Sequence, residues 1–180
     1  AIGVLSKTLR KLDLSGNDSL TAAGWQALLG GLADGALEEL LLQECGLDDE
    51  SARVIGPAIG AHAKSLRKLD LSENDSLTAA GWQALLGGLA DGALEELLLQ
   101  KCGLDDDKAG AIGPAIGAHA KSLRRLDFSR NNSLTAAGWE SLLGGLADGA
   151  LEELLLQKCG HCGLDDDKAG AIGPAIGAHA

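Results

Sequence analysis

Aromatic residues are scarce in this 180-residue chain, which contains three Trp, one Phe and no Tyr, and Met is absent altogether. Hydrophobic residues still make up 46% of the sequence, so the core must be built from Leu, Ile, Val and Ala. No apolar run approaches the roughly 18 residues of a membrane-spanning helix, and the run Leu40–Leu42 is only strand-sized. We therefore expect an aliphatic core and no membrane contact.

Positive charge is also under-represented, because 15 Lys and Arg stand against 26 Asp and Glu and give a formal net charge of −11. An acidic surface repels phosphate groups, which argues against nucleic-acid binding and against adsorption to anionic lipid. No Ser/His/Asp set, phosphate-binding loop or pair of carboxylates in a plausible cleft can be identified. These observations favour a protein that is not an enzyme and needs no cofactor.

Repetition dominates the rest of the sequence. The segment Leu9–Asn17 recurs at Leu66–Asn74 and, with changes, at Leu123–Asn131, at a spacing of 57 residues each time. The third copy also carries an insertion of three residues near the end of the chain. We therefore expect one continuous domain over residues 1–180, divided into three units: 9–65, 66–122 and 123–180.

Each unit contains two half-repeats, of 28 and 29 residues. The first begins at Leu9 and reads L-x-x-L-x-L-x-x-N, and the second begins at Leu37 and places Cys45 where the first has Asn. This pattern resembles the leucine-rich repeat, and the alternation of lengths and of Asn with Cys resembles its ribonuclease-inhibitor-like class. The resemblance implies an α/β leucine-rich-repeat solenoid (a horseshoe), with a parallel sheet on the concave face and helices on the convex face.

The spacing of apolar residues supports the same arrangement. Leu12 and Leu14 alternate with polar residues, so they point to one side of a short strand. After each strand the spacing becomes that of a helix face, with one set in each half-repeat: Leu20, Gly24, Leu28 and Leu32, then Leu47, Ile55 and Ile59. Because one half-repeat cannot bury its own apolar face, we expect six to stack.

Helix ends can also be predicted. Thr21 and Asp48 stand in N-cap positions for the two helices of the first unit. The glycines at 30–31 and the Asp-Gly pair at 34–35 should end the first helix. Pro57 falls inside the second helix and should kink or shorten it, because proline has no N–H to donate.

Side chains that flank the inward leucines form rows on the other face of the predicted sheet. The first row alternates cations with glutamates: Lys11, Glu39, Lys68, Glu96, Arg125 and Glu153. The second alternates aspartates with leucines: Asp13, Leu41, Asp70, Leu98, Asp127 and Leu155. A further charge ladder consists of Arg10, Glu38, Arg67, Glu95, Arg124 and Glu152. Two interpretations stay open: a binding surface with the leucines as apolar anchors, or rows that satisfy one another.

Two other residue types recur once in every unit. We expect the tryptophans to pack between adjacent helices, although an aromatic stripe for a partner is the alternative: Trp25, Trp82 and Trp139. We expect the histidines after the second helix to be solvated and too far apart to hold a metal: His62, His119 and His179.

Three of the four cysteines occupy the last position of the second half-repeat pattern: Cys45, Cys102 and Cys159. A thiol there should behave as a small buried hydrophobic group. Consecutive copies lie two strands apart, about 10 Å, which is too far for a disulfide. Reduced thiols predict a cytoplasmic protein, if the protein is natural.

The insertion completes Cys159-Gly160-His161-Cys162, which resembles the active-site tetrapeptide of protein disulfide isomerases. The resemblance implies that Cys159 attacks, Cys162 resolves and His161 stabilises the thiolate. Burial of Cys159 and the carboxylates at 165–167 should oppose that role by raising the thiol pKa. Three ligands are too few for a closed zinc site, so we predict no metal. A neutral loop insertion, a grafted redox site and, least favoured, a metal site stay as alternatives.

The combined expectation is a protein–protein interaction or structural scaffold with no intrinsic enzymatic activity and an unidentified partner. The near-identity of the units is typical of recent duplication or of a consensus or designed sequence, and we favour design. The terminal half-repeats carry no obvious polar caps, so end-to-end self-association is also predicted, through the sheet edges that border the end leucines: Leu12, Leu14, Leu154 and Leu156.

Overall fold

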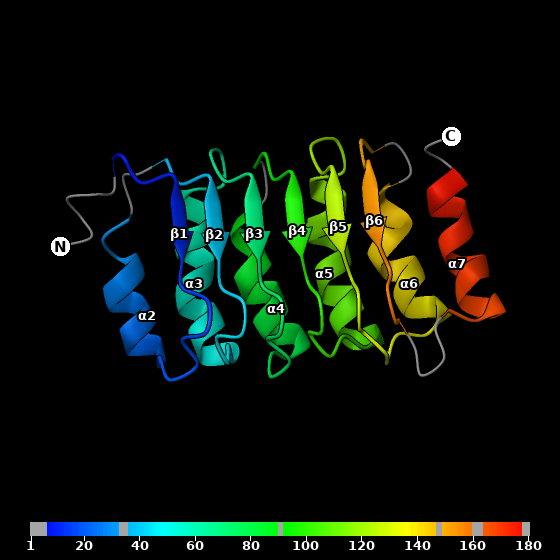
Figure 1. The fold of residues 1–180 in the computed structure, drawn as a ribbon, viewed down its shortest axis with the longest axis horizontal. Helices are drawn as coiled ribbons and strands as arrows, with labels where there is room; N and C mark the ends of the chain where they lie inside the picture. The colour runs from blue at the N-terminus through cyan, green and yellow to red at the C-terminus, as the bar shows by residue number, and fades with distance from the viewer. Residues whose placement is uncertain (1–6, 33–35, 90–91, 147–148, 160–163, 178–180) are drawn as a thin grey trace.

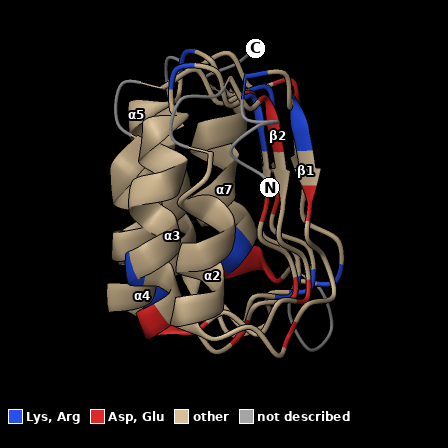
Figure 2. Cartoon of the chain, turned by 90° about the vertical axis from the view of Figure 1, so that its left-hand side faces the viewer, with Lys and Arg blue, Asp and Glu red and all other residues tan. Residues whose placement is uncertain are grey.

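The computed structural model of the chain describes residues 7–32, 36–89, 92–146, 149–159 and 164–177. They form a row of strands beside a row of helices, and the chain crosses from one row to the other along its whole length (Figure 1). Viewed from the end at which the chain begins, the helices all lie on one side of the sheet (Figure 2). The predicted α/β repeat solenoid is confirmed.

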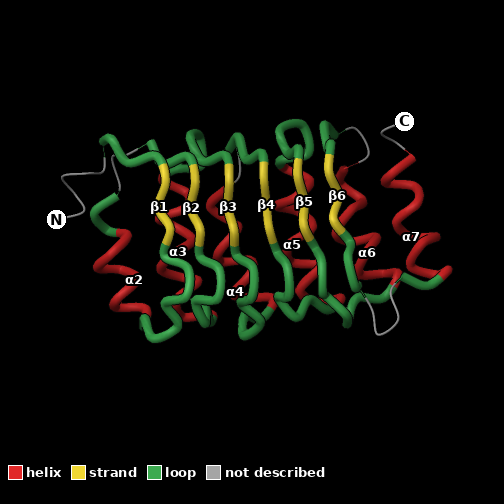
Figure 3. The backbone as a smooth tube through the Cα atoms, in the orientation of Figure 1, coloured by secondary structure: helices red, strands yellow, loops and turns green. Residues whose placement is uncertain are grey.

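Six strands of three residues each are found in the described part of the chain, and loops make up most of the layer to which they belong (Figure 3). They are all parallel and pair in chain order. Their bounds are Lys11–Asp13 (β1), Glu39–Leu41 (β2), Lys68–Asp70 (β3), Glu96–Leu98 (β4), Arg125–Asp127 (β5) and Glu153–Leu155 (β6).

The central leucine of each strand faces the central leucine of the next, from Leu12 and Leu40 at one end to Leu126 and Leu154 at the other. Those of the four internal strands are at most 3% exposed and belong to the core between sheet and helices. The period-two pattern of the sequence therefore predicted the inward face of the sheet correctly.

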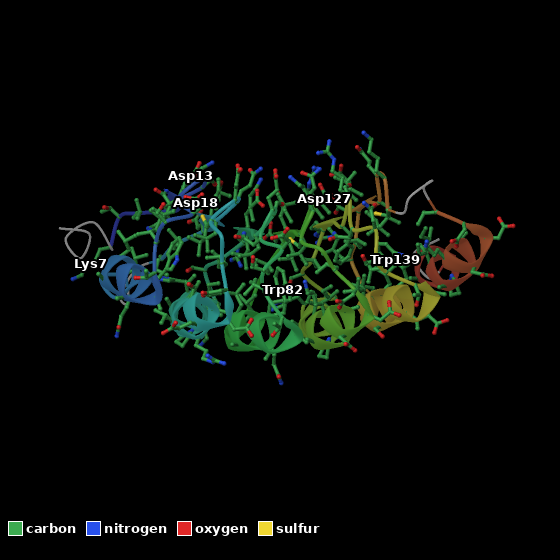
Figure 4. The ribbon with its side chains drawn as sticks, turned by 90° about the horizontal axis from the view of Figure 1, so that it is seen from below. Lys7, Asp13, Asp18, Trp82, Asp127 and Trp139 are labelled. Atoms are coloured by element: carbon green, nitrogen blue, oxygen red, sulfur yellow. The ribbon has the colours of Figure 1, made fainter. Side chains whose placement is uncertain are left out.

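Short and long helices alternate along the described chain, one after each strand. Their bounds are Ala22–Leu29 (α2), Asp49–Ala61 (α3), Ala79–Leu86 (α4), Asp106–Ala118 (α5), Ala136–Leu143 (α6) and Asp166–Gly177 (α7). A 3-10 turn follows α4 and another follows α6. The tryptophans are fully buried among these helices, as predicted: Trp25, Trp82 and Trp139. Figure 4 shows the gentle arc of the helix row, with its convex side away from the sheet.

The N-cap predictions are confirmed in position but only partly in chemistry. Asp48 is the N-cap of α3, and its carboxylate accepts a hydrogen bond from the N–H of Ser51 at 2.8 Å. Thr21 is the N-cap of α2, but its side chain makes no capping hydrogen bond. In the next unit the equivalent Thr78 hydroxyl donates instead to Asp49 of the preceding half-repeat, at 2.6 Å.

Pro57 does not shorten its helix, so that half of the expectation is wrong, and the kink stays a prediction. The helix α3 runs through it for 13 residues, as α5 runs through Pro114. The carbonyl that Pro57 leaves without an N–H partner belongs to Arg53, one turn earlier. Both residues are exposed, so water can satisfy that carbonyl and the helix continues.

The expectation that the histidines are solvated is also wrong. His62 and His119, the C-cap residues of α3 and α5, are each 3% exposed. Among the described residues, no group lies at hydrogen-bond distance and angle from a ring nitrogen of either histidine. The backbones of Leu89 and Gly92 are still near enough to act on His119, in the direction that raises its pKa. Burial is the main cause that lowers the pKa of His119. His179 lies outside the described residues.

Candidate functional site

The sheet face that points away from the helices carries all the residues proposed from the sequence as binding candidates. No described helix covers it, as the end-on view shows (Figure 2). Asp13 and Asp127 both lie on this side of the molecule, opposite the helix row (Figure 4). The strand register brings the two predicted rows together as continuous lines across six strands.

The charged residues of this face are paired within units. In the first row the pairs are Lys11–Glu39 at 3.1 Å, Lys68–Glu96 at 3.0 Å and Arg125–Glu153. In the neighbouring ladder they are Arg10–Glu38 at 3.3 Å, Arg67–Glu95 at 3.4 Å and Arg124–Glu152 at 3.0 Å. No ion pair in the described chain joins Glu39 to Lys68, although their strands are adjacent. Each predicted ladder is therefore three separate pairs, which form no continuous network.

The second row places one leucine between two aspartates on neighbouring strands. Leu41, for example, is in register with Asp13 on one side and Asp70 on the other. Each aspartate accepts a hydrogen bond from the N–H of a serine two residues later, and this bond is the main cause that lowers the pKa of Asp13. The three leucines are half-buried, so part of each side chain stays accessible: Leu41, Leu98 and Leu155.

Glu73 connects three half-repeats at the edge of the same face. One of its oxygens accepts a hydrogen bond from the Gln43 amide at 3.0 Å, and the other lies 2.8 Å from the Lys101 ammonium. These contacts lower the pKa of Glu73, with the Lys101 hydrogen bond as the larger cause. The position is one of the few that vary, since Gly16 and Arg130 replace Glu73 in the other units.

A set of buried hydrogen bonds around one asparagine, here called the bracket, joins each unit to the one before it, and it was not predicted from the sequence. Asn74 is 1% exposed, and its Oδ1 accepts hydrogen bonds from the N–H groups of Cys45 and Leu47, both at 3.1 Å. Its Nδ2 donates to the carbonyl of Leu42 at 2.8 Å. Asn131 repeats the bracket one unit later, at Cys102, Leu104 and Leu99. The Asn at the end of the repeat pattern was the available signal.

Comparisons with known proteins agree with this geometry. A family model described as "Leucine Rich repeat" matches residues 5–29, 62–86 and 119–143, which is once per unit. The ribonuclease inhibitor of Sus scrofa is 38% identical to the chain over 158 residues. The chain is a leucine-rich-repeat protein of the ribonuclease-inhibitor-like class. The match covers 84% of this leucine-rich-repeat chain and 34% of the inhibitor, so the chain spans about a third of that relative's length.

Solved structures of other leucine-rich-repeat-like folds are also similar to this protein. Actin-Binding Site 2 of leiomodin-1 superposes with a TM-score of 0.60 at 17% identity, over 81% of this chain and 83% of that one. The C-terminal domain of tropomodulin from Caenorhabditis elegans gives a TM-score of 0.52 at 12% identity, over 98% and 92%. At such low identities the similarity supports the fold alone.

The structural cysteines of this leucine-rich-repeat protein are buried, as predicted. Their thiols donate to backbone carbonyls of the preceding half-repeat, from Cys45 to Leu14 at 3.1 Å and from Cys159 to Phe128 at 3.2 Å. Burial raises the pKa of all three thiols, to about 12 for Cys102.

The Cys-Gly-His-Cys motif is only partly described, because His161 and Cys162 lie outside the described residues. Cys159 itself is 1% exposed. Burial is the main cause that raises its pKa, and the carboxylate that adds to the effect belongs to Asp127 on the neighbouring strand. The expected burial of Cys159 is therefore confirmed, while the expected influence of the carboxylates at 165–167 stays a prediction.

In the described part of the chain, no group of His, Cys, Asp and Glu has an arrangement that could hold a metal ion. None of the described helices combines the length and apolar character that a membrane crossing requires.

Proposed function

We propose that this leucine-rich-repeat protein is a protein-binding scaffold whose partner contacts the open face of the sheet. The proposal assigns the scaffold no enzymatic activity of its own. It favours a designed origin, supported by the near-identity of the units. The proposed contact residues are the first two rows of that face: Lys11, Asp13, Glu39, Leu41, Lys68, Asp70, Glu96, Leu98, Arg125, Asp127, Glu153 and Leu155.

The observation that carries the proposal is the row of accessible leucines, one per unit, on a face that no described element covers. Leu41, Leu98 and Leu155 are flanked by aspartates whose carboxylates are held in place by turn hydrogen bonds. Burying such apolar groups against a partner contributes to affinity, while fixed charges around them select the partner. The face therefore supplies apolar anchors within a pre-arranged polar surround.

The chemistry of the chain favours a partner with a basic surface. A net charge of −11 attracts cationic proteins over long range and speeds their association at low salt. The relative from Sus scrofa is named an inhibitor of ribonuclease, so a ribonuclease is the first protein to test. Because the cations on the sheet face are already paired with glutamates, we expect the exposed carboxylates and leucines to dominate recognition.

The test measures binding of a basic ribonuclease by calorimetry, and compares two triple variants of equal charge. One carries Leu41→Lys, Leu98→Lys and Leu155→Lys on the sheet face. The control carries three lysines at exposed helix positions, Ala23→Lys, Ala80→Lys and Ala137→Lys. We expect the first to lose binding and the second to weaken it only slightly. Equal losses would show that net charge alone drives binding, and absent wild-type binding would remove this partner class.

A thiol–disulfide site at Cys159, His161 and Cys162 is the alternative function. The motif supports it, and the raised pKa of the buried Cys159 opposes it. A thiol count under native conditions distinguishes the two functions. Two fast-reacting thiols, together with refolding of reduced ribonuclease that Cys162→Ala abolishes, would support the redox site. One fast-reacting thiol or none, with equal refolding rates, is the result expected for the scaffold.

A further inference from the structure

The two ends of the solenoid resemble the two sides of the contact that joins its units. Inside the chain, the second half-repeat of one unit packs against the first half-repeat of the next, through β2 with β3 and α3 with α4. Among the described residues, no strand pairs with β6 on its outer side and no helix follows α7. The first half-repeat, with β1 and α2, has no preceding unit described. These two end faces have nearly the same sequences as the two sides of the internal contact, except that three extra residues stand between Cys159 and Leu164.

The apolar residues of the end faces are exposed where their internal equivalents are buried. At the C-terminal face, Leu164 and Ile176 are 41% and 56% exposed, whereas the equivalent Leu104 and Ile116 are 0% and 1% exposed. A hollow of about 390 Å³ opens there, lined by leucines of α6 and β6 and by Ile176. At the N-terminal face, four leucines are only partly buried: Leu9, Leu12, Leu14 and Leu20.

The polar groups of the two end faces are also complementary. Asn17 is exposed, and its amide donates hydrogen bonds to the carbonyls of Leu14 and Ser15 in its own loop. Its equivalents Asn74 and Asn131 bracket the preceding half-repeat instead. At the other end, Cys159 presents the backbone N–H that corresponds to the one Asn74 accepts from. Each end thus supplies one half of the buried bracket.

A second polar pair is divided in the same way. The carboxylate of Asp49 accepts hydrogen bonds from the hydroxyl of Thr78 at 2.6 Å and from its N–H at 3.0 Å. Asp106 and Thr135 form the same pair one unit later. Among the described residues, the equivalent Thr21 makes no capping hydrogen bond, and the equivalent carboxylate at the start of α7 is that of Asp166.

Glycines mark the places where the internal helices approach most closely. A Cβ on Gly56 would lie 2.0 Å from the carbonyl oxygen of Ala84, and one on Gly81 would lie 2.1 Å from the Asp49 carboxylate. The equivalent Gly173 on α7 has no atom within 4 Å of that position, and a Cβ on Gly24 of α2 would meet only Leu20 of its own half-repeat. The end faces therefore keep the space that a docked neighbour needs.

We propose that the chain binds a second copy of itself head to tail, with the C-terminal face of one copy against the N-terminal face of the next. Strand β1 of the second copy extends the sheet beside β6, and the exposed apolar groups, the Asn bracket and the Asp–Thr pair become buried as they are inside the chain. The two faces in contact differ, so the association is heterologous, and the gentle arc of one copy is too shallow for two copies to close into a ring, so the oligomers grow beyond the dimer.

The experiment uses substitutions that the free chain tolerates but a docked copy does not. Gly173→Ala places a methyl group against the carbonyl of Ala27 of the next copy, and Gly24→Ala places one against its Asp166. Gly170→Ala is the matched control, because neither Gly170 nor its internal equivalent Gly110 has an atom within 4 Å of a Cβ. Melting temperatures confirm that each variant is folded.

Sedimentation velocity is measured as the concentration rises from about 10 μM to about 1 mM. We expect the mass of the wild type and of Gly170→Ala to rise beyond that of a dimer. Gly173→Ala and Gly24→Ala should each weaken association by about tenfold or more. An equal mixture of these two variants should regain association but stop at the dimer, because each retains one intact face.

Several results would overturn the proposal. One is a wild-type chain that stays monomeric over the whole concentration range. Another is a wild-type mass that stops at the dimer, which indicates a contact between identical faces. Association of either single variant at wild-type strength, or a mixture that remains monomeric, would show that these faces do not meet.

Discussion

At the residue scale, Asn131 shows how one side chain joins two units. It is 1% exposed and satisfies the N–H groups of Cys102 and Leu104 and the carbonyl of Leu99. Asn131→Ala leaves these buried groups without partners, so we expect the free energy of unfolding to fall by about 3 kcal/mol. Urea denaturation measures this loss. The control is Asn17→Ala, whose exposed side chain should cost less than about 1 kcal/mol in dilute solution; equal losses would contradict the role given to the bracket.

His119 belongs to the same scale because its burial makes stability depend on pH. Burial lowers its pKa below the usual 6.5, so the unfolded state binds more protons as the pH falls. Stability should therefore be complete above pH 6.5 and decrease as the pH falls below it. Urea denaturation between about pH 5 and about pH 8 checks this, with a shallower slope expected for His119→Gln. The carboxylates of Asp49 and Asp106, whose pKa values are lowered from 3.8, make stability depend on pH only in more acidic solution.

At the element scale, helix packing depends on glycines that face a neighbouring helix. A Cβ on Gly113 of α5 would lie 2.1 Å from the carbonyl oxygen of Ser141 on α6. Gly113→Ala should therefore separate the helices and reduce stability by about 2 kcal/mol. Gly110 lies on the same helix with no neighbour within 4 Å, so Gly110→Ala should increase stability by up to about 1 kcal/mol. Thermal unfolding compares them, and two shifts of the same sign would disprove the close approach.

Most features of the strands and helices could be predicted from the sequence, but the behaviour of one proline and one helix cap could not. Strand leucines and helix faces were predictable because their period is set by the local geometry of the backbone. The persistence of α3 through Pro57 was not, because it depends on which side of the helix faces water. The missing side-chain cap at Thr21 has a similar cause, since its equivalent Thr78 takes its partner from another half-repeat.

At the scale of the whole molecule, stability should depend on the number of stacked units, because each unit contacts only its neighbours. Deleting residues 66–122 joins Ser65 to Leu123 and recreates the existing junction between Ser122 and Leu123. We expect a folded chain with a lower melting temperature and a urea m-value reduced by about a third. Circular dichroism measures both, and an unfolded product would contradict the predicted division into units.

The repeat register, the inward leucines and the burial of the cysteines and tryptophans could be predicted from the amino-acid sequence, because they follow from local periods repeated along the chain. The burial of His62 and His119, the division of the charge ladders into pairs and the asparagine bracket on the preceding half-repeat became visible only in the folded chain. Contacts between residues about 30 positions apart depend on the rise and rotation between half-repeats, which no local pattern specifies. The same stacking geometry leaves the two end faces complementary.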